Sequence, residues 1–500
     1  MSGLAKVGVR AVKWSAVSTV ARFVLQLGAQ VVLARILGPE NYGIFGIGMV
    51  VLTLSNFLAN FGFGWNLLHK QDLTDEDIRF AFTWQVVAGA TAMVVLFLLA
   101  PTLSMYFKEP RVLPVIQWLS LACLLSAATS PASNLLQRDL NFKAVGMVQV
   151  GSYACGYVLV GIPMALAGMG VNALVAAWLV QVGTAFVAMY VLRPHPVRPL
   201  FHFSGSGKAM GTSGQVFATN IVNWCLNNAD RVIIGRMLNV HAVGLYTAGY
   251  NLAIMPNTLL LGALQPAFMS AASRMQADPQ RLGRAYLQMV ATVWVLALPM
   301  FVFLATISAD LIQFLYGTQW ADTAKVLAIL FLGMPAYVAW GLTTPVLWNT
   351  GRKHHEAMLQ LPVLLLGVAA LIWCMQWGVQ WAAAVASVIL FLRMFAVCIS
   401  AFKALELRFS NLLPHIARGM FLSLLVLLGV EAAHVSVARF GMPLVNLLCS
   451  SLLALLLAFV GLWWRPALLG EHASAMVVRF VPQLRRYLAV ATDATEKSHV

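Results

Sequence analysis

The sequence has little charge, and its cysteines follow no metal-binding or redox spacing. Only 10% of the 500 residues are charged, against 60% that are hydrophobic, and the mean hydropathy is +0.81. So much apolar surface cannot be hidden in a water-soluble core, which excludes soluble classes and indicates a membrane protein. The six cysteines contain no CxxC pair, so we interpret them as small apolar packing residues.

The sequence also contains no complete nucleotide-binding, catalytic or metal-binding motif. The segment "FSGSGKAMG" at 203–211 resembles a phosphate loop, but His202 occupies the position of the first glycine and Ala209 that of the magnesium-binding hydroxyl. The short loops contain no Ser/His/Asp set, paired carboxylates or metal-ligand spacing. The sequence therefore predicts no ATP site, metal, cofactor or enzymatic activity.

Long apolar runs are abundant instead. About fourteen of them have roughly the 20 residues that a helix needs to cross a bilayer, and together they predict an all-α, polytopic membrane bundle. The expected spans are 13–37, 41–66, 80–105, 112–136, 145–167, 170–192, 212–236, 244–271, 286–307, 323–347, 356–376, 378–402, 413–434 and 442–464.

The net charge of +15 is distributed as the positive-inside rule requires. Of the 32 Lys and Arg residues, 6 fall in the loops on one side and 3 within spans, and the other 23 gather on the opposite side. We therefore predict that both termini are cytoplasmic and that nucleic acid is not a partner. The first apolar run is too long for a signal peptide, so we expect it to be retained as a helix.

One motif occurs twice. "RILGPENYGIFGIGMV" at 35–50 returns as "RMLNVHAVGLYTAGYN" at 236–251, with one offset of 201 that aligns Gly43 with Gly244. The same offset places polar residues on polar residues: Ser18 on Thr219, Thr19 on Asn220, Arg22 on Asn223, Gln26 on Asn227, Gln30 on Arg231 and Asn56 on Asn257. Spacings of three and four residues put these groups on one face of each helix.

Polar groups inside a bilayer must face protein or a water-filled cavity, since lipid offers no hydrogen-bonding partner. The repeat therefore predicts two parallel six-helix lobes that share one polar chamber. The candidate cavity residues are Arg22, Gln26, Gln30, Asn56, Asn60, Asn223, Asn227, Asp230, Arg231 and Asn257.

The three arginines within spans differ in their expected roles. Arg22 lies about nine residues into its helix, hence roughly 14 Å deep, and we expect it to bind an anionic ligand. Arg231 follows Asp230 and could either face the cavity or reach for the outer interface. Arg393 has only apolar neighbours along the chain, so we expect it to pack or to extend towards the membrane surface.

The predicted organisation has four parts. Residues 1–192 form an N-terminal six-helix lobe, 193–211 an amphipathic cytoplasmic linker, and 212–402 a C-terminal six-helix lobe. Residues 403–500 hold two extra transmembrane helices, which have no counterpart in the repeat, and a cytoplasmic tail.

Five segments resemble the Wzx-type polysaccharide flippases of the multidrug/oligosaccharidyl-lipid/polysaccharide (MOP) exporter superfamily, most of all the colanic-acid and xanthan type. They are "KWSAVSTV", "LARILGPENYGIF", "LLQRDLNFKAVGMV", "GLYTAGYNLAIMP" and "PAFMSAASRMQADPQRL". The resemblance implies a V-shaped pair of lobes that opens alternately to each side of the bacterial inner membrane.

The same resemblance implies the substrate and the partners. The substrate would be an undecaprenyl-diphosphate-linked oligosaccharide repeat unit, moved between leaflets for exopolysaccharide or lipopolysaccharide biosynthesis. A polysaccharide polymerase and a chain-length regulator would be protein partners, and membrane lipids would surround the chain.

Two rival functions remain open. A multidrug or cation antiporter of the same superfamily would need an embedded carboxylate, and Asp230 is the one buried acid that we expect. A membrane-embedded polysaccharide polymerase would be expected to show a large outer loop with reactive residues, which this sequence lacks.

Overall fold

The computed structural model describes residues 3–59, 67, 73–202, 213–275, 278–350, 353–437, 443–464 and 468–469, and these contain helices but no strand. In chain order the elements are α1 (Gly3–Ala59), α3 (Asp75–Phe107), α4 (Val112–Arg138), α5 (Phe142–Tyr153), the π-helix η1 (Ala154–Gly161), α6 (Ile162–Leu166), α7 (Val171–Leu192), α9 (Ser213–Met237), α10 (Val240–Arg274), α11 (Pro279–Thr306), α12 (Ser308–Leu315), η2 (Thr318–Trp320), α13 (Ala321–Asn349), α14 (Lys353–Cys374), η3 (Met375–Trp377), α15 (Val379–Ala404), η4 (Phe409–Asn411), α16 (Leu413–Val437) and α17 (Pro443–Trp464).

These helices have the length that membrane crossing demands. Within the described residues, 11 helical segments are long and apolar enough to span a bilayer. One of them, α1, carries the first two expected spans across a break at Gly38 (φ 71°), which Pro39 follows. The expected spans at 212–236 and 244–271 fall on α9 and α10. The predicted all-α, polytopic fold is confirmed.

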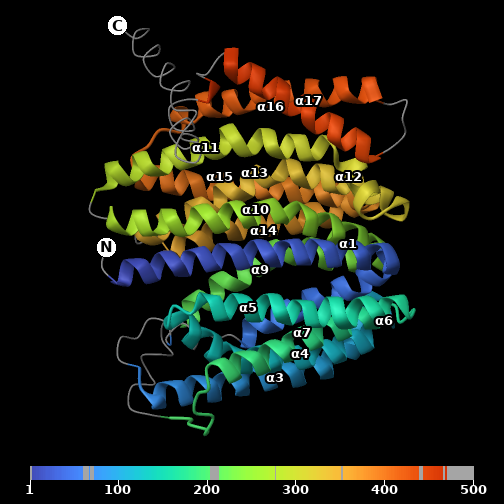
Figure 1. Ribbon diagram of the computed structural model, residues 1–500, viewed down its shortest axis with the longest axis vertical. Coiled ribbons are helices and arrows are strands. Elements are labelled where there is room, and N and C mark those ends of the chain that lie inside the picture. Colours follow the sequence, from blue (N-terminus) through green and yellow to red (C-terminus); the bar gives the residue numbers. More distant parts are fainter. Residues whose placement is uncertain are drawn as a thin grey trace. The chain divides into compact units, whose positions relative to one another are not determined.

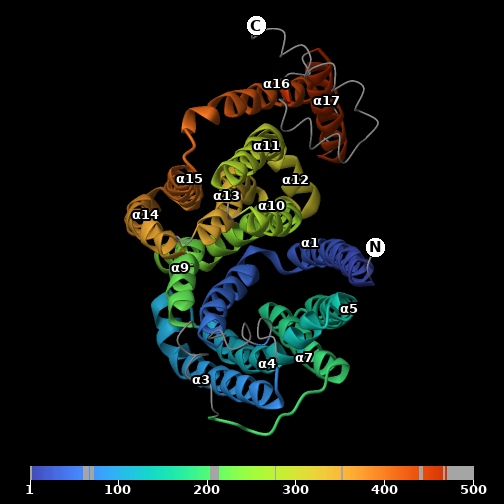
Figure 2. The same cartoon turned by 90° about the vertical axis from the view of Figure 1, so that its left-hand side faces the viewer.

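The chain divides into two compact units, Met1–Thr247 and Ala248–Val500, which we describe in turn. In the first unit α4 is central, because α1, α3 and α7 all pack on it (Figure 1). Helix α5 packs on α1 and α7, and α9 lies against α1 and α3 (Figure 2). The division that the sequence predicts, with lobes ending at 192 and 402, stays a prediction.

The duplicated motif has the same local structure in both copies. A break at Gly38 separates the two halves of α1, and a break at Leu238 and Asn239 separates α9 from α10. The repeated glycines then meet. A Cβ atom on Gly43 would lie 1.7 Å from the carbonyl O of Val240, and one on Gly244 would lie 1.8 Å from the carbonyl O of Pro39. Glycine is therefore repeated because the two backbones touch at this point.

We expect Gly43→Ala to lower the stability of the protein by about 1–3 kcal/mol, because the added methyl group overpacks a backbone contact. The measurement is the midpoint of thermal unfolding of the detergent-solubilised protein. Gly28→Ala is the matched control on the same helix, since a Cβ there would have no atom within 4 Å. Equal midpoints for the two variants would contradict the proposed role of the backbone contact.

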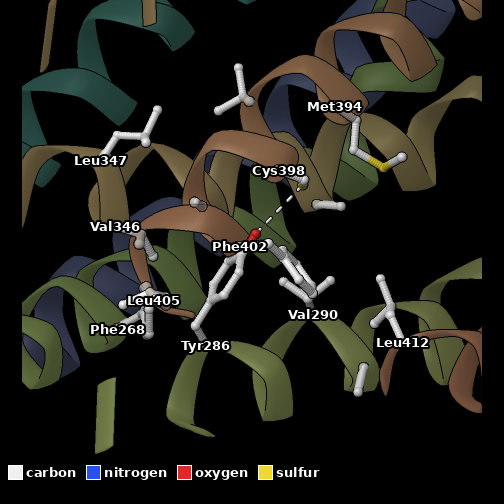
Figure 3. Close-up of a cluster of buried hydrophobic side chains, with 14 of the residues drawn as sticks. Phe268, Tyr286, Val290, Val346, Leu347, Met394, Cys398, Phe402, Leu405 and Leu412 are labelled. Atoms are coloured by element: carbon white, nitrogen blue, oxygen red, sulfur yellow. Dashed lines mark hydrogen bonds between the residues drawn. The ribbon is translucent and has the colours of Figure 1, made fainter. Parts of the chain in front are cut away.

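The second unit is organised around α13, on which α11 and α15 pack. Figure 3 shows side chains from α10, α11, α13 and α15 meeting in its core. The Tyr286 hydroxyl lies 2.8 Å from Thr343 Oγ1 and 3.5 Å from Cys398 Sγ, so its polar end is satisfied inside an apolar cluster. The extra helices α16 and α17 pack on each other, and α16 packs on α11 (Figure 1).

The described part of the predicted linker, 193–202, contains no helix and lies alongside the first half of α3. The Leu200 amide donates to Thr83 Oγ1 at 2.9 Å, and Trp84 Nε1 donates to the Phe201 carbonyl O at 3.2 Å. His195 lies between the rings of Phe82 and Tyr190, and its burial lowers the pKa of the imidazole. Residues 203–211 of the predicted linker lie outside the described residues.

Candidate functional site

Arg22 lies where α1 and α5 approach each other closely. A Cβ on Gly146 would lie 2.4 Å from the side chain of Ser18, so this glycine lets the two helices come together. One turn further along both helices, Arg22 Nη1 donates to Gln149 Oε1 at 3.4 Å. The guanidinium is half-buried and also interacts electrostatically with Tyr153. No carboxylate among the described residues forms an ion pair with it.

The polar stripe continues along α1 with changing exposure. Gln26 is exposed, whereas Gln30 is 8% exposed and its carbonyl O accepts a 3.3 Å hydrogen bond from the Tyr42 hydroxyl. Asn56 lies on the same helix, but its side chain is outside the described residues, as is the whole of Asn60. The accessible part of the described stripe therefore centres on Arg22 and Gln26.

Helix α9 carries the matching stripe within the same unit. Asn223 and Asn227 are half-buried. Asp230 is 7% exposed and accepts a 2.5 Å hydrogen bond from the Tyr246 hydroxyl, so its carboxylate is engaged by the aromatic residue of the repeated motif. Arg231 is half-buried, and its Nη1 donates to Asn228 Oδ1 at 3.3 Å.

Asn257, the remaining candidate, belongs to the second unit. It is fully buried, and its Nδ2 lies 2.8 Å from Met334 Sδ. Its Oδ1 has no hydrogen-bond partner among the described residues. Seven of the predicted cavity residues thus have described side chains in the first unit and one has its side chain in the second.

The structure decides between the two roles expected for Arg393 and corrects the expectation for the buried acids. Arg393 is 1% exposed and packs inside the protein: its Nε donates to Gln360 Oε1 at 3.0 Å, and its Cζ lies 4.1 Å from the centre of the Trp340 ring. Glu356, 2% exposed, accepts from Gln360 Nε2 at 3.3 Å. Asp230 is therefore not the one buried acid, because tertiary packing buries Glu356 at the start of α14.

Three residues on α5 and η1, of which the first two interact with Arg22, were not predicted. Gln149, Tyr153 and Tyr157 recur every four residues along α5 and η1, and this spacing is the signal that could have revealed them. The Tyr153 and Tyr157 rings are stacked, with centroids 4.5 Å apart and planes 12° apart. A half-buried cation that has an amide and one aromatic residue beside it, with a second aromatic ring stacked on the first, can bind a ligand that joins negative charge to a polar, ring-shaped group.

Known proteins match more than half of the chain. A family model described as "Polysaccharide biosynthesis protein" matches residues 32–325. The lipopolysaccharide biosynthesis protein WzxC of Escherichia coli (strain K12) is 24% identical over 64% of this chain and 65% of its own length. The succinoglycan biosynthesis transport protein ExoT of Rhizobium meliloti (strain 1021) is 26% identical over 68% of each chain. The match with WzxC thus spans just under two thirds of that relative.

Two solved structures share the fold. The lipid II flippase MurJ in an inward closed conformation aligns with a TM-score of 0.70 and 12% identity, covering 90% of this chain and 98% of MurJ. An inward-facing MATE family multidrug transporter of the MOP superfamily aligns with a TM-score of 0.56 and 14% identity, covering 77% and 93% of the two chains. At these identities the likeness concerns the fold alone.

Proposed function

This chain belongs to the polysaccharide biosynthesis protein family that matches residues 32–325, and on that basis we propose that it is a flippase. Its substrate would be an undecaprenyl-diphosphate-linked oligosaccharide repeat unit, carried across the bacterial inner membrane by alternating access for exopolysaccharide or lipopolysaccharide biosynthesis. The names of the relatives WzxC and ExoT, which refer to polysaccharide biosynthesis and transport, support this proposal.

The proposal depends mainly on the surroundings of Arg22. The three arginines within spans have different surroundings: Arg393 is enclosed by Gln360 and Trp340, and Arg231 follows the buried Asp230. Arg22 is half-buried and makes one long hydrogen bond, to Gln149, among the described residues. It is therefore the membrane arginine best able to accept an anionic ligand.

The magnitudes also favour a phosphate ligand. Insertion scales put the cost of an arginine at the helix centre at about 3 kcal/mol. A phosphate charge about 4 Å away would return roughly 4 kcal/mol at an effective dielectric constant of 20. A diphosphate would thus offset the cost of placing Arg22 in the membrane, which the neutral amide of Gln149 does only in part.

The cation antiporter remains the second candidate, because Glu356 supplies the buried carboxylate that such a transporter would use. Glu356 already accepts hydrogen bonds from Gln360 and from Thr344 Oγ1, the latter at 3.2 Å. A carboxylate engaged in this way is less suited to binding a cation from solution, so we place this function second.

The test is translocation by the purified protein in proteoliposomes. A fluorescent undecaprenyl-diphosphate-linked oligosaccharide is placed in both leaflets, and the fraction protected from a membrane-impermeant quencher is followed over time. We expect the protein to accelerate the exchange between leaflets. Efflux of a small organic cation without exchange of the lipid would favour the antiporter and reject the flippase.

We also propose an inner-membrane location with both termini cytoplasmic, and a polysaccharide polymerase and a chain-length regulator as partners.

The topology is tested with single cysteines, which are introduced after the six native ones have been replaced. We predict that a cysteine at Asp322, exposed at the start of α13, reacts with an impermeant thiol reagent in intact cells, whereas one at Arg281, exposed at the start of α11, is protected. The opposite labelling pattern would invert the topology.

A further inference from the structure

A stripe of side chains on α5 and η1 runs past Arg22, and we propose that it binds the first sugar next to the diphosphate. Gln149, Tyr153 and Tyr157 form this stripe, which we call the tyrosine stripe. The inference rests on the proposed function and extends it, because it assigns the carbohydrate part of the substrate to a stripe that starts beside Arg22 and continues beyond it to Tyr157.

The π-helix explains why the two tyrosines are aligned. In an α-helix with 3.6 residues per turn, side chains four residues apart diverge by about 40° around the axis. In η1 the hydrogen bonds reach five residues back, as when the Ile162 amide donates to the Tyr157 carbonyl O. The wider turn brings the fourth residue closer to alignment, and the Tyr153 and Tyr157 planes differ by only 12°. Such π-helical turns occur often at functional sites.

Packing against α7 holds the π-helix in place. A Cβ on Gly156 would lie 2.3 Å from the Ala177 carbonyl O and 2.8 Å from Gln181 Cβ, and one on Gly161 would lie 2.9 Å from Ala177 Cβ. The two helices are therefore in backbone contact on the side where the glycines lie. Because α7 holds η1 in position, the tyrosine stripe is preorganised, which lowers the entropic cost of binding a ligand.

The stripe begins at the proposed diphosphate site. Gln149 accepts the hydrogen bond from Arg22, and Tyr153 interacts electrostatically with the same guanidinium. Tyr157 lies eight residues beyond Gln149, which at a rise of ~1.5 Å per residue amounts to no more than about 12 Å. A sugar joined directly to a diphosphate on Arg22 falls within that distance.

The two rings have different tasks. Tyr153 is 6% exposed and stacked, so it is a positioning residue that orients its neighbour. Tyr157 is half-buried, so part of its side chain is accessible. We assign to the accessible part of this ring the apolar contact with the C–H groups of a sugar. Gln149 supplies an amide that can donate to a sugar hydroxyl while it accepts from Arg22.

The experiment compares two probes on the full-length protein in nanodiscs: undecaprenyl diphosphate, and undecaprenyl diphosphate carrying one hexose. We expect the wild-type protein to bind the glycosylated probe more tightly. Tyr157→Leu should lose about 3- to 10-fold in affinity for the glycosylated probe and less than about twofold for the other. Tyr157→Phe and Tyr153→Phe, which keep the stack, should retain the preference, and Tyr153→Ala should lose it.

Leu159→Ala is the matched control, because this residue lies in the same π-helix with a side chain that is 68% exposed. It should bind both probes like the wild type. Retained affinity for undecaprenyl diphosphate shows that each variant is folded. The inference is overturned if Tyr157→Leu keeps the preference, if it weakens both probes equally, or if the wild-type protein binds both probes alike. Failure of the wild-type protein to bind either probe would instead reject the proposed function, and the inference with it.

Discussion

Replacement of Arg22 by Ala should abolish polymer export although the protein still inserts into the membrane. Losing one partner of a desolvated charge pair costs about 2–5 kcal/mol, which corresponds to a decrease of about 30-fold or more in binding. Arg22 makes one hydrogen bond of 3.4 Å to the described part of the chain, so its removal should disturb the fold little.

The nature of the replacement separates a ligand-binding arginine from a structural one. Arg22→Lys should keep partial activity, because the charge remains while the bidentate fork is lost. Arg22→Gln keeps hydrogen bonding without the charge and should behave like Ala. If Arg22 served only to donate the hydrogen bond to Gln149, the Arg22→Gln variant would export nearly normally. Loss of that hydrogen bond in Arg22→Ala would then appear as a smaller amount of inserted protein.

Export is measured in cells that lack the native gene and is normalised to the amount of inserted protein. Arg111→Gln is the control, since this arginine makes an ion pair with Glu40 at 2.7 Å and its side chain is 53% exposed. It should export normally, because exposed ion pairs contribute little. Normal export by a well-inserted Arg22→Gln variant would remove Arg22 from the site and, with it, the main argument for an anionic lipid.

The sequence predicts the helices and the repeat well because both depend on local signals. Apolar runs of sufficient length define the spans, and a single offset aligns the motif at 35–50 with that at 236–251. The reciprocal contact of Gly43 and Gly244 could not be predicted, since a repeated spacing does not say which backbones approach each other. The structure shows why glycine occurs in both copies: a Cβ at either position would clash with the backbone of the other copy.

The tyrosine stripe and the buried acid were missed for different reasons. A tyrosine in a span usually indicates a membrane-interface residue, and the four-residue spacing of the stripe does not by itself distinguish a π-helical turn from an α-helical one. Glu356 follows "RKHH" and therefore resembles part of a solvated turn. Only the packing of α14 on α15 and α13 buries it.

Arg393 belongs to a buried polar chain within the second unit. Its Nε donates to Gln360 Oε1, Gln360 Nε2 donates to Glu356 Oε1, and Thr344 Oγ1 donates to the same carboxylate oxygen. The guanidinium also lies over the ring of Trp340, which contributes a cation–π interaction. These contacts come from three helices, so the chain ties α13, α14 and α15 together.

Arg393→Ala should therefore destabilise the protein more than any surface change. Removing one charge leaves the other buried without compensation, which typically costs about 3–5 kcal/mol. We expect the midpoint of thermal unfolding to fall by about 6 °C or more and the amount of inserted protein to decrease. Arg393→Met, which nearly preserves the volume, should still be destabilised, because the loss is electrostatic as well as steric.

A second change tests this explanation. Glu356→Gln removes the negative charge, so Arg393→Met combined with Glu356→Gln should be more stable than Arg393→Met alone, with a coupling of about 1–3 kcal/mol. Lys403→Ala is the control on the same helix, because Lys403 is exposed in the last turn of α15 and should be neutral. If Glu356→Gln gave no rescue, the contribution of Arg393 to stability would come from Trp340 and from packing. A role for Glu356 in the transport cycle, as the antiporter alternative requires, would then gain support.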